Sequence, residues 1–245
     1  MFGGVGMGAA IAALERTCGR PVIWATAQYL SYARPPSVVD LDVRIAAEGK
    51  HTTQARVAAH VGDTEILTVN AALGSRPNGE RLQWAQPPEA PAPETCPEST
   101  RWRSDVADLH SQIEARIAHG VHGRNPAAGP SPDGRLVLWI RPRGGQVVDS
   151  AMLAIMADHV PSAIGPALGR DAGGNSLDNT IRFMEIVPTS WVLCDITIVG
   201  IDRGIGHGAM RLYAQDGRLL ATASQSLIVR LRDKAEARAA AEADQ

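Results

Sequence analysis

Residues 35–67, PPSVVDLDVRIAAEGKHTTQARVAAHVGDTEIL, decide the fold, because a matching stretch recurs 153 positions later as residues 188–220, PTSWVLCDITIVGIDRGIGHGAMRLYAQDGRLL. The two stretches align without a gap and share one pattern of strands and turns. Identical residues occur at these pairs of positions: Pro35 and Pro188, Ser37 and Ser190, Val39 and Val192, Asp42 and Asp195, Ile45 and Ile198, Asp63 and Asp216, Leu67 and Leu220. Sparse identities in one continuous register indicate an internal duplication.

The same shift pairs three polar residues of the second half with apolar residues of the first. The pairs are Asp158 with Val5, Ser176 with Ile23, and Gln225 with Ala72. A polar trio in one copy, answered by apolar residues in the other, is what a duplicated enzyme with one surviving site would show.

Composition excludes several classes of protein. The 245 residues suffice for two small domains or one large domain with a sizeable core. A net charge of -2, with no basic block before the C-terminal tail, argues against nucleic acid as the main partner. No apolar run approaches the ~18 to 20 residues that span a bilayer, and the apolar start lacks the basic region of a signal peptide.

The cysteines and histidines predict no metal site. Cys18, Cys96 and Cys194 are widely scattered and form no CxxC pair, which is typical of reduced thiols in a cytoplasmic protein. The histidines also lack a metal-binding spacing. We therefore expect no metal and no cofactor.

The pattern of elements predicts an α+β protein in four segments. The first half, residues 1–75, has a helix followed by strands; a Pro-rich linker, residues 76–104, cannot continue a helix or a central strand. The second half, residues 105–232, precedes a flexible tail, residues 233–245. Helices are predicted at 4–16 and 147–159, and strands at 21–33, 38–46, 52–61, 64–73, 101–118, 135–141, 176–187, 191–201, 206–214 and 218–231.

Four short sequence motifs, in order along the chain, resemble those of a known family. They are FGG at 2–4, MADHVPSAIG at 156–165, SLDNTIRF at 176–183 and QDGRLLATASQSLIVR at 215–230. Together they resemble the acyl-CoA thioesterase II family. One departure is Asn179, at a position where members of that family often have a His.

The resemblance implies a double hot-dog fold, in which two fused units each wrap an antiparallel sheet on a helix. It also implies a cytoplasmic homo-oligomer of lipid metabolism that hydrolyses acyl-CoA without a cofactor. Asp158, Ser176 and Gln225 fall on the family positions that orient the attacking water, and the first half would be catalytically silent.

The residues themselves give this chemistry partial support. Thioester hydrolysis needs an activated water and donors for an oxyanion. Asp158 lies near the end of an apolar helix, where burial and the negative helix terminus would raise its pKa, although an acid there often faces solvent or caps the next helix. Gln225 lies in an apolar strand and needs a partner if buried, whereas a lone Ser176 is more often a turn residue.

Other readings remain open at this stage. A non-catalytic acyl-CoA or acyl-carrier binding protein would keep the fold without turnover. A hot-dog hydratase would need a His several residues after the Asp, whereas His159 follows Asp158 directly. The oxyanion donors should be backbone N–H groups at an unidentified helix start. Arg141, Arg143 and Arg182 could meet the phosphates of coenzyme A, although exposed arginines are usually only solvated.

Overall fold

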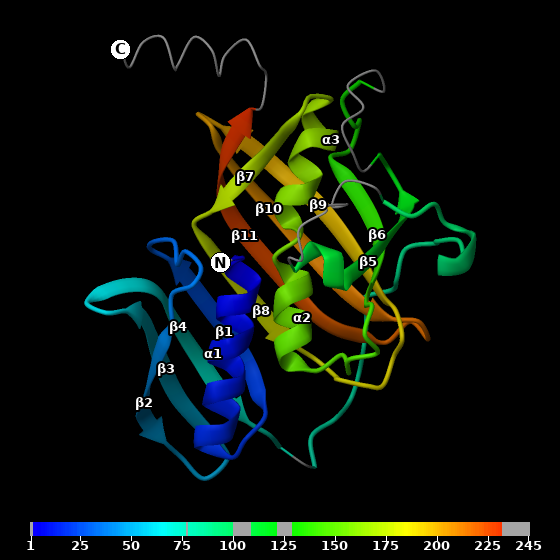
Figure 1. The fold of residues 1–245 in the computed structure, drawn as a ribbon. Helices are drawn as coiled ribbons and strands as arrows, with labels where there is room; N and C mark the ends of the chain where they lie inside the picture. The colour runs from blue at the N-terminus through cyan, green and yellow to red at the C-terminus, as the bar shows by residue number, and fades with distance from the viewer. Residues whose placement is uncertain (1, 77, 100–108, 122–128, 232–245) are drawn as a thin grey trace, which may run out of the picture.

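A computed structural model describes residues 2–76, 78–99, 109–121 and 129–231. These residues form one 11-stranded sheet with the helices gathered on one face (Figure 1). The elements in chain order are α1 (Gly3–Cys18), β1 (Val22–Tyr29), β2 (Asp40–Glu48), β3 (Thr52–Val61), β4 (Thr64–Gly74), the 3-10 turns η1 (Pro93–Thr95) and η2 (His110–Gln112), β5 (Ile113–His119), β6 (Arg135–Pro142), α2 (Ser150–Ala157), the 3-10 turn η4 (Val160–Ala163), α3 (Ile164–Leu168), β7 (Ala172–Ser176), β8 (Asp178–Phe183), β9 (Val192–Asp202), β10 (Ile205–Ala214) and β11 (Leu219–Leu231).

The strand order places the two halves edge to edge. It runs β2-β3-β4-β1-β8-β11-β10-β9-β6-β5, with β7 paired to β11. β1 and β8 pair antiparallel at the junction, where Thr26 faces Thr180 and Ala27 faces Asn179. The hydroxyl oxygens of Thr26 and Thr180 lie 3.0 Å apart at this junction. A pseudo-twofold axis therefore passes through this pair and relates β1 to β8 by a shift of 154 residues. The α+β double hot-dog fold predicted from the sequence is therefore confirmed.

The duplication holds in the strands and fails in the helices. β3 shifted by 153 positions coincides with β10, and shifted β2 lies within β9. The same shift would start the second helix at residue 156, whereas α2 begins at Ser150. Asp149 accounts for that earlier start, because its carboxylate accepts a hydrogen bond of 2.8 Å from the N–H of Met152 and caps the helix.

Glycines bring α1 and α2 into close contact on the inner face of the sheet (Figure 1). A Cβ on Gly4 would lie 2.9 Å from Cα of Ile155, and one on Gly8 would lie 2.9 Å from the carbonyl oxygen of Ala151. Any larger residue would therefore push the helices apart. The glycine-rich start of the chain therefore serves close packing between the two helices.

Several predicted elements differ from the observed ones, and β1 ends at Tyr29 rather than at residue 33. The strand predicted at 176–187 is observed as β8, Asp178–Phe183, and a separate strand, β7, precedes it and ends at Ser176. Both strands pair with β11, at different positions along it. The strand predicted at 101–118 is observed only as β5, and residues 101–108 lie outside the described residues. The helix predicted at 147–159 included Val147 and Val148 because they are apolar. In the structure both residues precede Asp149, the N-cap of α2.

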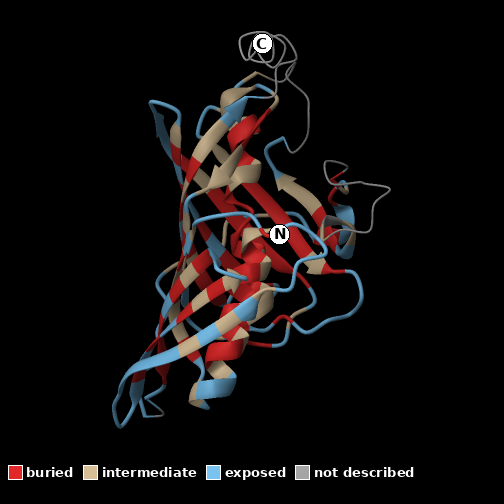
Figure 2. Cartoon of the chain, turned by 60° about the vertical axis from the view of Figure 1, so that its left-hand side comes forward, coloured by how far each residue is buried: buried red, intermediate tan, exposed pale blue. Residues whose placement is uncertain are grey.

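One apolar helical stretch is longer than the apolar runs predicted from the sequence. Among the described residues, Ser150–Leu168 has the length and mean hydropathy, 1.2, of a membrane span. However, 61% of it is buried inside the protein, so its apolar side chains are accounted for by packing against the sheet. Figure 2 shows this buried central layer and the exposed residues of the outlying strand β2.

Residues 78–99, which belong to the predicted linker, lie against the outer face of the second-half sheet. Alternate residues of β6 face opposite ways, so Leu138 joins the main core while Trp139 joins a second cluster beneath the linker. Trp139 donates a hydrogen bond of 2.9 Å to the carbonyl of Pro91, and the Tyr213 hydroxyl donates one of 2.9 Å to that of Gln86. The linker is therefore anchored by hydrogen bonds and apolar contacts. The predicted tail, residues 233–245, lies outside the described residues.

Candidate active site

The structure brings Asp158, Ser176 and Gln225 together. Gln225 Nε2 donates hydrogen bonds of 2.5 Å to Asp158 Oδ1 and 2.7 Å to Ser176 Oγ. Ser176 Oγ donates a longer one, 3.3 Å, to the same oxygen of Asp158. The three residues are separated by up to 67 positions in the sequence and form one hydrogen-bonded cluster.

Three different elements position these side chains. Asp158 is the C-cap residue that directly follows α2, just before the chain turns into η4. Ser176 is the last residue of β7 and pairs with Leu227 of β11, two positions beyond Gln225 on the same strand. Pairing of β7 with β11 therefore brings the hydroxyl beside the amide, and helix packing places the carboxylate above both.

Burial sets the protonation behaviour of Asp158. The residue is 5% exposed, and this loss of hydration raises its pKa from 3.8 to about 6. Hydrogen bonds from Gln225, the Gly4 N–H and Ser176 favour the carboxylate and limit the rise. Asp158 is thus ionised at pH 7 while remaining a far stronger base than an exposed aspartate.

The first half of the chain contributes to this cluster through its backbone. The N–H of Gly4, in the first turn of α1, donates a hydrogen bond of 2.6 Å to Asp158 Oδ2. The N–H groups of a first helical turn have no partner within the helix and carry the positive end of its dipole. The sequence analysis expected oxyanion donors at a helix start. It did not predict that the FGG motif would instead supply a backbone donor to the Asp158 carboxylate.

Two further polar side chains, Tyr29 and Asn179, lie beside the cluster. The position that a Cβ on Gly3 would take is 2.9 Å from Tyr29 Cζ and 3.0 Å from Asp158 Oδ2, so the phenol and the carboxylate are neighbours. Burial and the nearby Asp158 charge raise the pKa of Tyr29 well above its ordinary value, and the Asn179 amide partly offsets this. Neither residue had been singled out as a site candidate.

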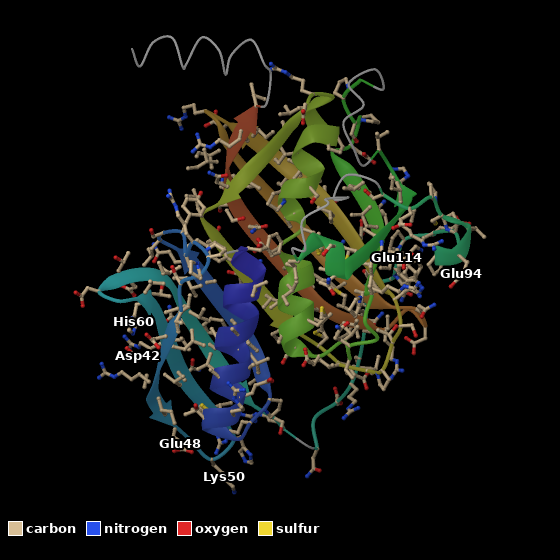
Figure 3. The ribbon with its side chains drawn as sticks, viewed as in Figure 1. Asp42, Glu48, Lys50, His60, Glu94 and Glu114 are labelled. Carbon is tan, nitrogen blue, oxygen red and sulfur yellow. The ribbon has the colours of Figure 1, made fainter. Side chains whose placement is uncertain are left out.

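Two arginines considered for coenzyme A are already paired. Arg141 donates a hydrogen bond of 2.8 Å to the buried Glu114 and lies 4.3 Å over the ring of Trp191. Arg143 contacts Glu98 and Glu114. Figure 3 labels Glu114 near the far edge of the sheet from β2. Arg182, in contrast, is exposed on β8.

The described residues offer no gathered set of metal ligands. Among them, no three His, Cys, Asp or Glu side chains lie close enough to hold a metal ion. The labelled pair Asp42 and His60, on β2 and β3, is a surface contact of 3.1 Å at the opposite end of the sheet (Figure 3). The residues gathered at the site itself are a buried carboxylate and its hydrogen-bonding neighbours.

A family model supplies the decisive comparison. Residues 86–229 match the model of the acyl-CoA thioesterase C-terminal domain, which covers more than half of the chain. The chain belongs to the acyl-CoA thioesterase family. A crystal structure from Novosphingobium aromaticivorans, of a protein provisionally described as a thioesterase, agrees with this placement: it is 37% identical, with a TM-score of 0.84, over 93% of this chain and 87% of that one.

More distant thioesterases share the fold. An acyl-CoA thioesterase II from Mycobacterium marinum is 21% identical, with a TM-score of 0.73, over 95% of this chain and 90% of that one. A TesB protein from Mycobacterium avium subspecies paratuberculosis is 19% identical, with a TM-score of 0.76, over 94% of this chain and 87% of that one. No curated protein matches the chain significantly.

Proposed function

We propose that this member of the thioesterase family hydrolyses acyl-CoA to a free acid and coenzyme A, using a water molecule activated by Asp158. The observation that carries the proposal is the buried carboxylate itself. Its pKa of about 6 suits a base that works near neutral pH. Three donors hold it in a fixed orientation, which is what positioned proton transfer requires.

Proton transfer and bond cleavage would proceed in two steps. Asp158 takes a proton from water while the water oxygen attacks the thioester carbonyl carbon, giving a tetrahedral oxyanion. Collapse of this intermediate breaks the C–S bond, and the leaving thiolate takes the proton from Asp158. The products are the carboxylic acid and the coenzyme A thiol, and the Asp158 carboxylate is restored without a covalent intermediate.

Ser176 and Gln225 would position the attacking water. The Gln225 amide nitrogen is occupied by Asp158 and Ser176, whereas its buried Oε1 has no hydrogen-bond partner among the described residues. A water held by Asp158 could donate its second hydrogen to that oxygen. Each water hydrogen would then point at an acceptor, which leaves an oxygen lone pair directed at the substrate.

We extend the proposal to the organisation of the chain. Residues 1–75 would form a first hot-dog unit with no base of its own. The sequence alignment sets the apolar residues Val5, Ile23 and Ala72 against the polar trio. Strand register places Ala71, which is also apolar, at the position equivalent to Gln225. Residues 76–104 would act as a linker without a catalytic group. The free cysteines support a cytoplasmic location, and we infer a homo-oligomer from what is typical of the family.

The test is release of coenzyme A thiol from purified protein with a panel of acyl-CoA substrates of increasing chain length. We expect turnover with at least one member, and the dependence of kcat/KM on length then identifies the substrate class. Binding of acyl-CoA by calorimetry, without thiol release from any member of the panel, would instead support the rival function of a non-catalytic acyl-CoA binding protein.

A further inference from the structure

Two buried polar side chains beside the site lack hydrogen bonds. Asn179 is 0% exposed, yet neither its Oδ1 nor its Nδ2 has a partner among the described residues. The buried hydroxyl of Tyr29 likewise has none there at hydrogen-bond distance and angle, although the Asn179 side chain lies close enough to lower the pKa of Tyr29. Burying an unpaired amide or hydroxyl costs free energy, so natural proteins retain such groups where a ligand or water completes the hydrogen bonds.

Strand register places both residues on the inner face of the sheet, next to the catalytic candidates. Asn179 on β8 faces Ala27 of β1, and Tyr29 follows two positions later on the same face. On the other side of β8, Thr180 pairs with Ser224 of β11, so Asn179 is adjacent to Gln225. The amide is thus flanked by one group from each half of the chain.

We propose that Tyr29 Oη and Asn179 Nδ2 donate hydrogen bonds to the carbonyl oxygen of the bound thioester and to the oxyanion that forms during hydrolysis. The inference rests on the proposed function and names two residues that would touch the reacting oxygen. It makes the site a shared one, because Tyr29 belongs to the first half and Asp158 to the second.

The chemistry of the two donors fits this role. Both are neutral at pH 7, and the raised pKa of Tyr29 keeps its proton in place beside the Asp158 carboxylate. A neutral donor can face both the carbonyl and its anion without protonating either. The helix-terminal N–H of Gly4 donates to Asp158 and is therefore not the donor to the substrate carbonyl in this arrangement.

Kinetic tests use Tyr29→Phe and Asn179→Leu. Each should lower kcat by roughly 10²- to 10³-fold, as expected for loss of an oxyanion donor, and should raise KM by a smaller factor of roughly tenfold, because the carbonyl of the bound thioester loses a weaker contact. Matched controls on exposed residues, Tyr32→Phe and Asn70→Leu, should leave kcat unchanged. Asn179→Leu replaces unpaired polar atoms by an apolar group of similar size, so its thermal stability should be equal or higher. A purely structural role for Asn179 predicts a lower thermal stability for this variant.

A binding test separates this inference from the proposed function. The probes are an S-alkyl coenzyme A thioether, which lacks the carbonyl, and a ketone analogue with a methylene between carbonyl and sulfur. Wild-type protein should bind the ketone roughly tenfold more tightly, and Tyr29→Phe should abolish that preference.

The outcomes distinguish the two claims. If wild-type protein shows no acyl-CoA turnover but prefers the ketone, and Tyr29→Phe removes that preference, the proposed hydrolysis is refuted. The proposed carbonyl-binding role of Tyr29 and Asn179 is then retained. Normal turnover with an unaltered preference and kcat in the variants would overturn the carbonyl site alone. Failure of wild-type protein to prefer the ketone, or to bind either analogue, would also overturn it.

Discussion

The substitution Asp158→Asn should change the pH dependence of stability by a magnitude that follows from burial. Folding raises the pKa of Asp158 from 3.8 to about 6. Each pKa unit corresponds to about 1.4 kcal/mol, so the shift of roughly two units is linked to about 3 kcal/mol. Because the folded protein binds this proton more tightly than the unfolded chain does, the contribution is fully present below pH 3.8 and is lost as pH rises through 6.

The Asn variant has no titrating group at this position and should fold with the same contacts. Its Oδ1 can accept from the Gly4 N–H, while its Nδ2 can donate to Gln225 if that amide turns to present its unpartnered Oε1. We therefore expect wild-type protein to lose roughly 2.4 kcal/mol of that total relative to the variant between pH 4 and pH 7.

Urea unfolding at closely spaced pH values measures this difference directly. Other titrating groups are common to both proteins and cancel in the comparison. A difference in unfolding free energy that stays constant across this pH range would refute the assignment of a raised pKa to Asp158. A difference that changes in the opposite direction would mean that hydrogen bonding outweighs burial at the carboxylate.

Other expectations concern the neighbours of the base. The kcat of wild-type protein should rise with pH through about 6, and Gln225→Ala, which removes a donor to the Asp158 carboxylate, should move that midpoint upward and lower kcat less than Asp158→Asn does. Gly4→Ala should lower stability by roughly 1–3 kcal/mol, measured by chemical unfolding, while Gly200→Ala, where an added Cβ meets nothing within 4 Å, should be close to neutral. Tyr213→Phe should loosen the linker and cost about 1 kcal/mol without lowering kcat, and a fall in kcat would show that the linker assists catalysis.

Local sequence patterns predicted much of the fold. The alternation of residues 52–61 and 64–73 around Gly62 and Asp63 matches β3 and β4 to within one residue. Strand register and turn chemistry act over a few residues, so a single sequence records them. The separate strand β7 escaped prediction because its pairing depends on how two segments share β11, which is a property of the whole sheet.

The site was predictable only in part for the same reason. Asp158 and Gln225 were selected because a resemblance pointed to them and because a polar residue in an apolar element is conspicuous. Gly4 carries no functional side chain, and its role depends on contact between two helices that start far apart in the chain. Tyr29 and Asn179 look ordinary in a strand, and only the packed structure shows that their polar atoms are buried without partners.

The central claim, that Asp158 activates water for thioester hydrolysis, is tested most directly by comparing kcat for wild-type protein and Asp158→Asn on the best acyl-CoA of the panel. Asp149→Asn is the matched control, since it lies at the other end of α2 and retains its capping oxygen. We predict a fall of roughly 10²- to 10⁴-fold for Asp158→Asn, unchanged acyl-CoA binding, and wild-type kcat for the control. An Asp158→Asn variant with wild-type kcat would contradict the account.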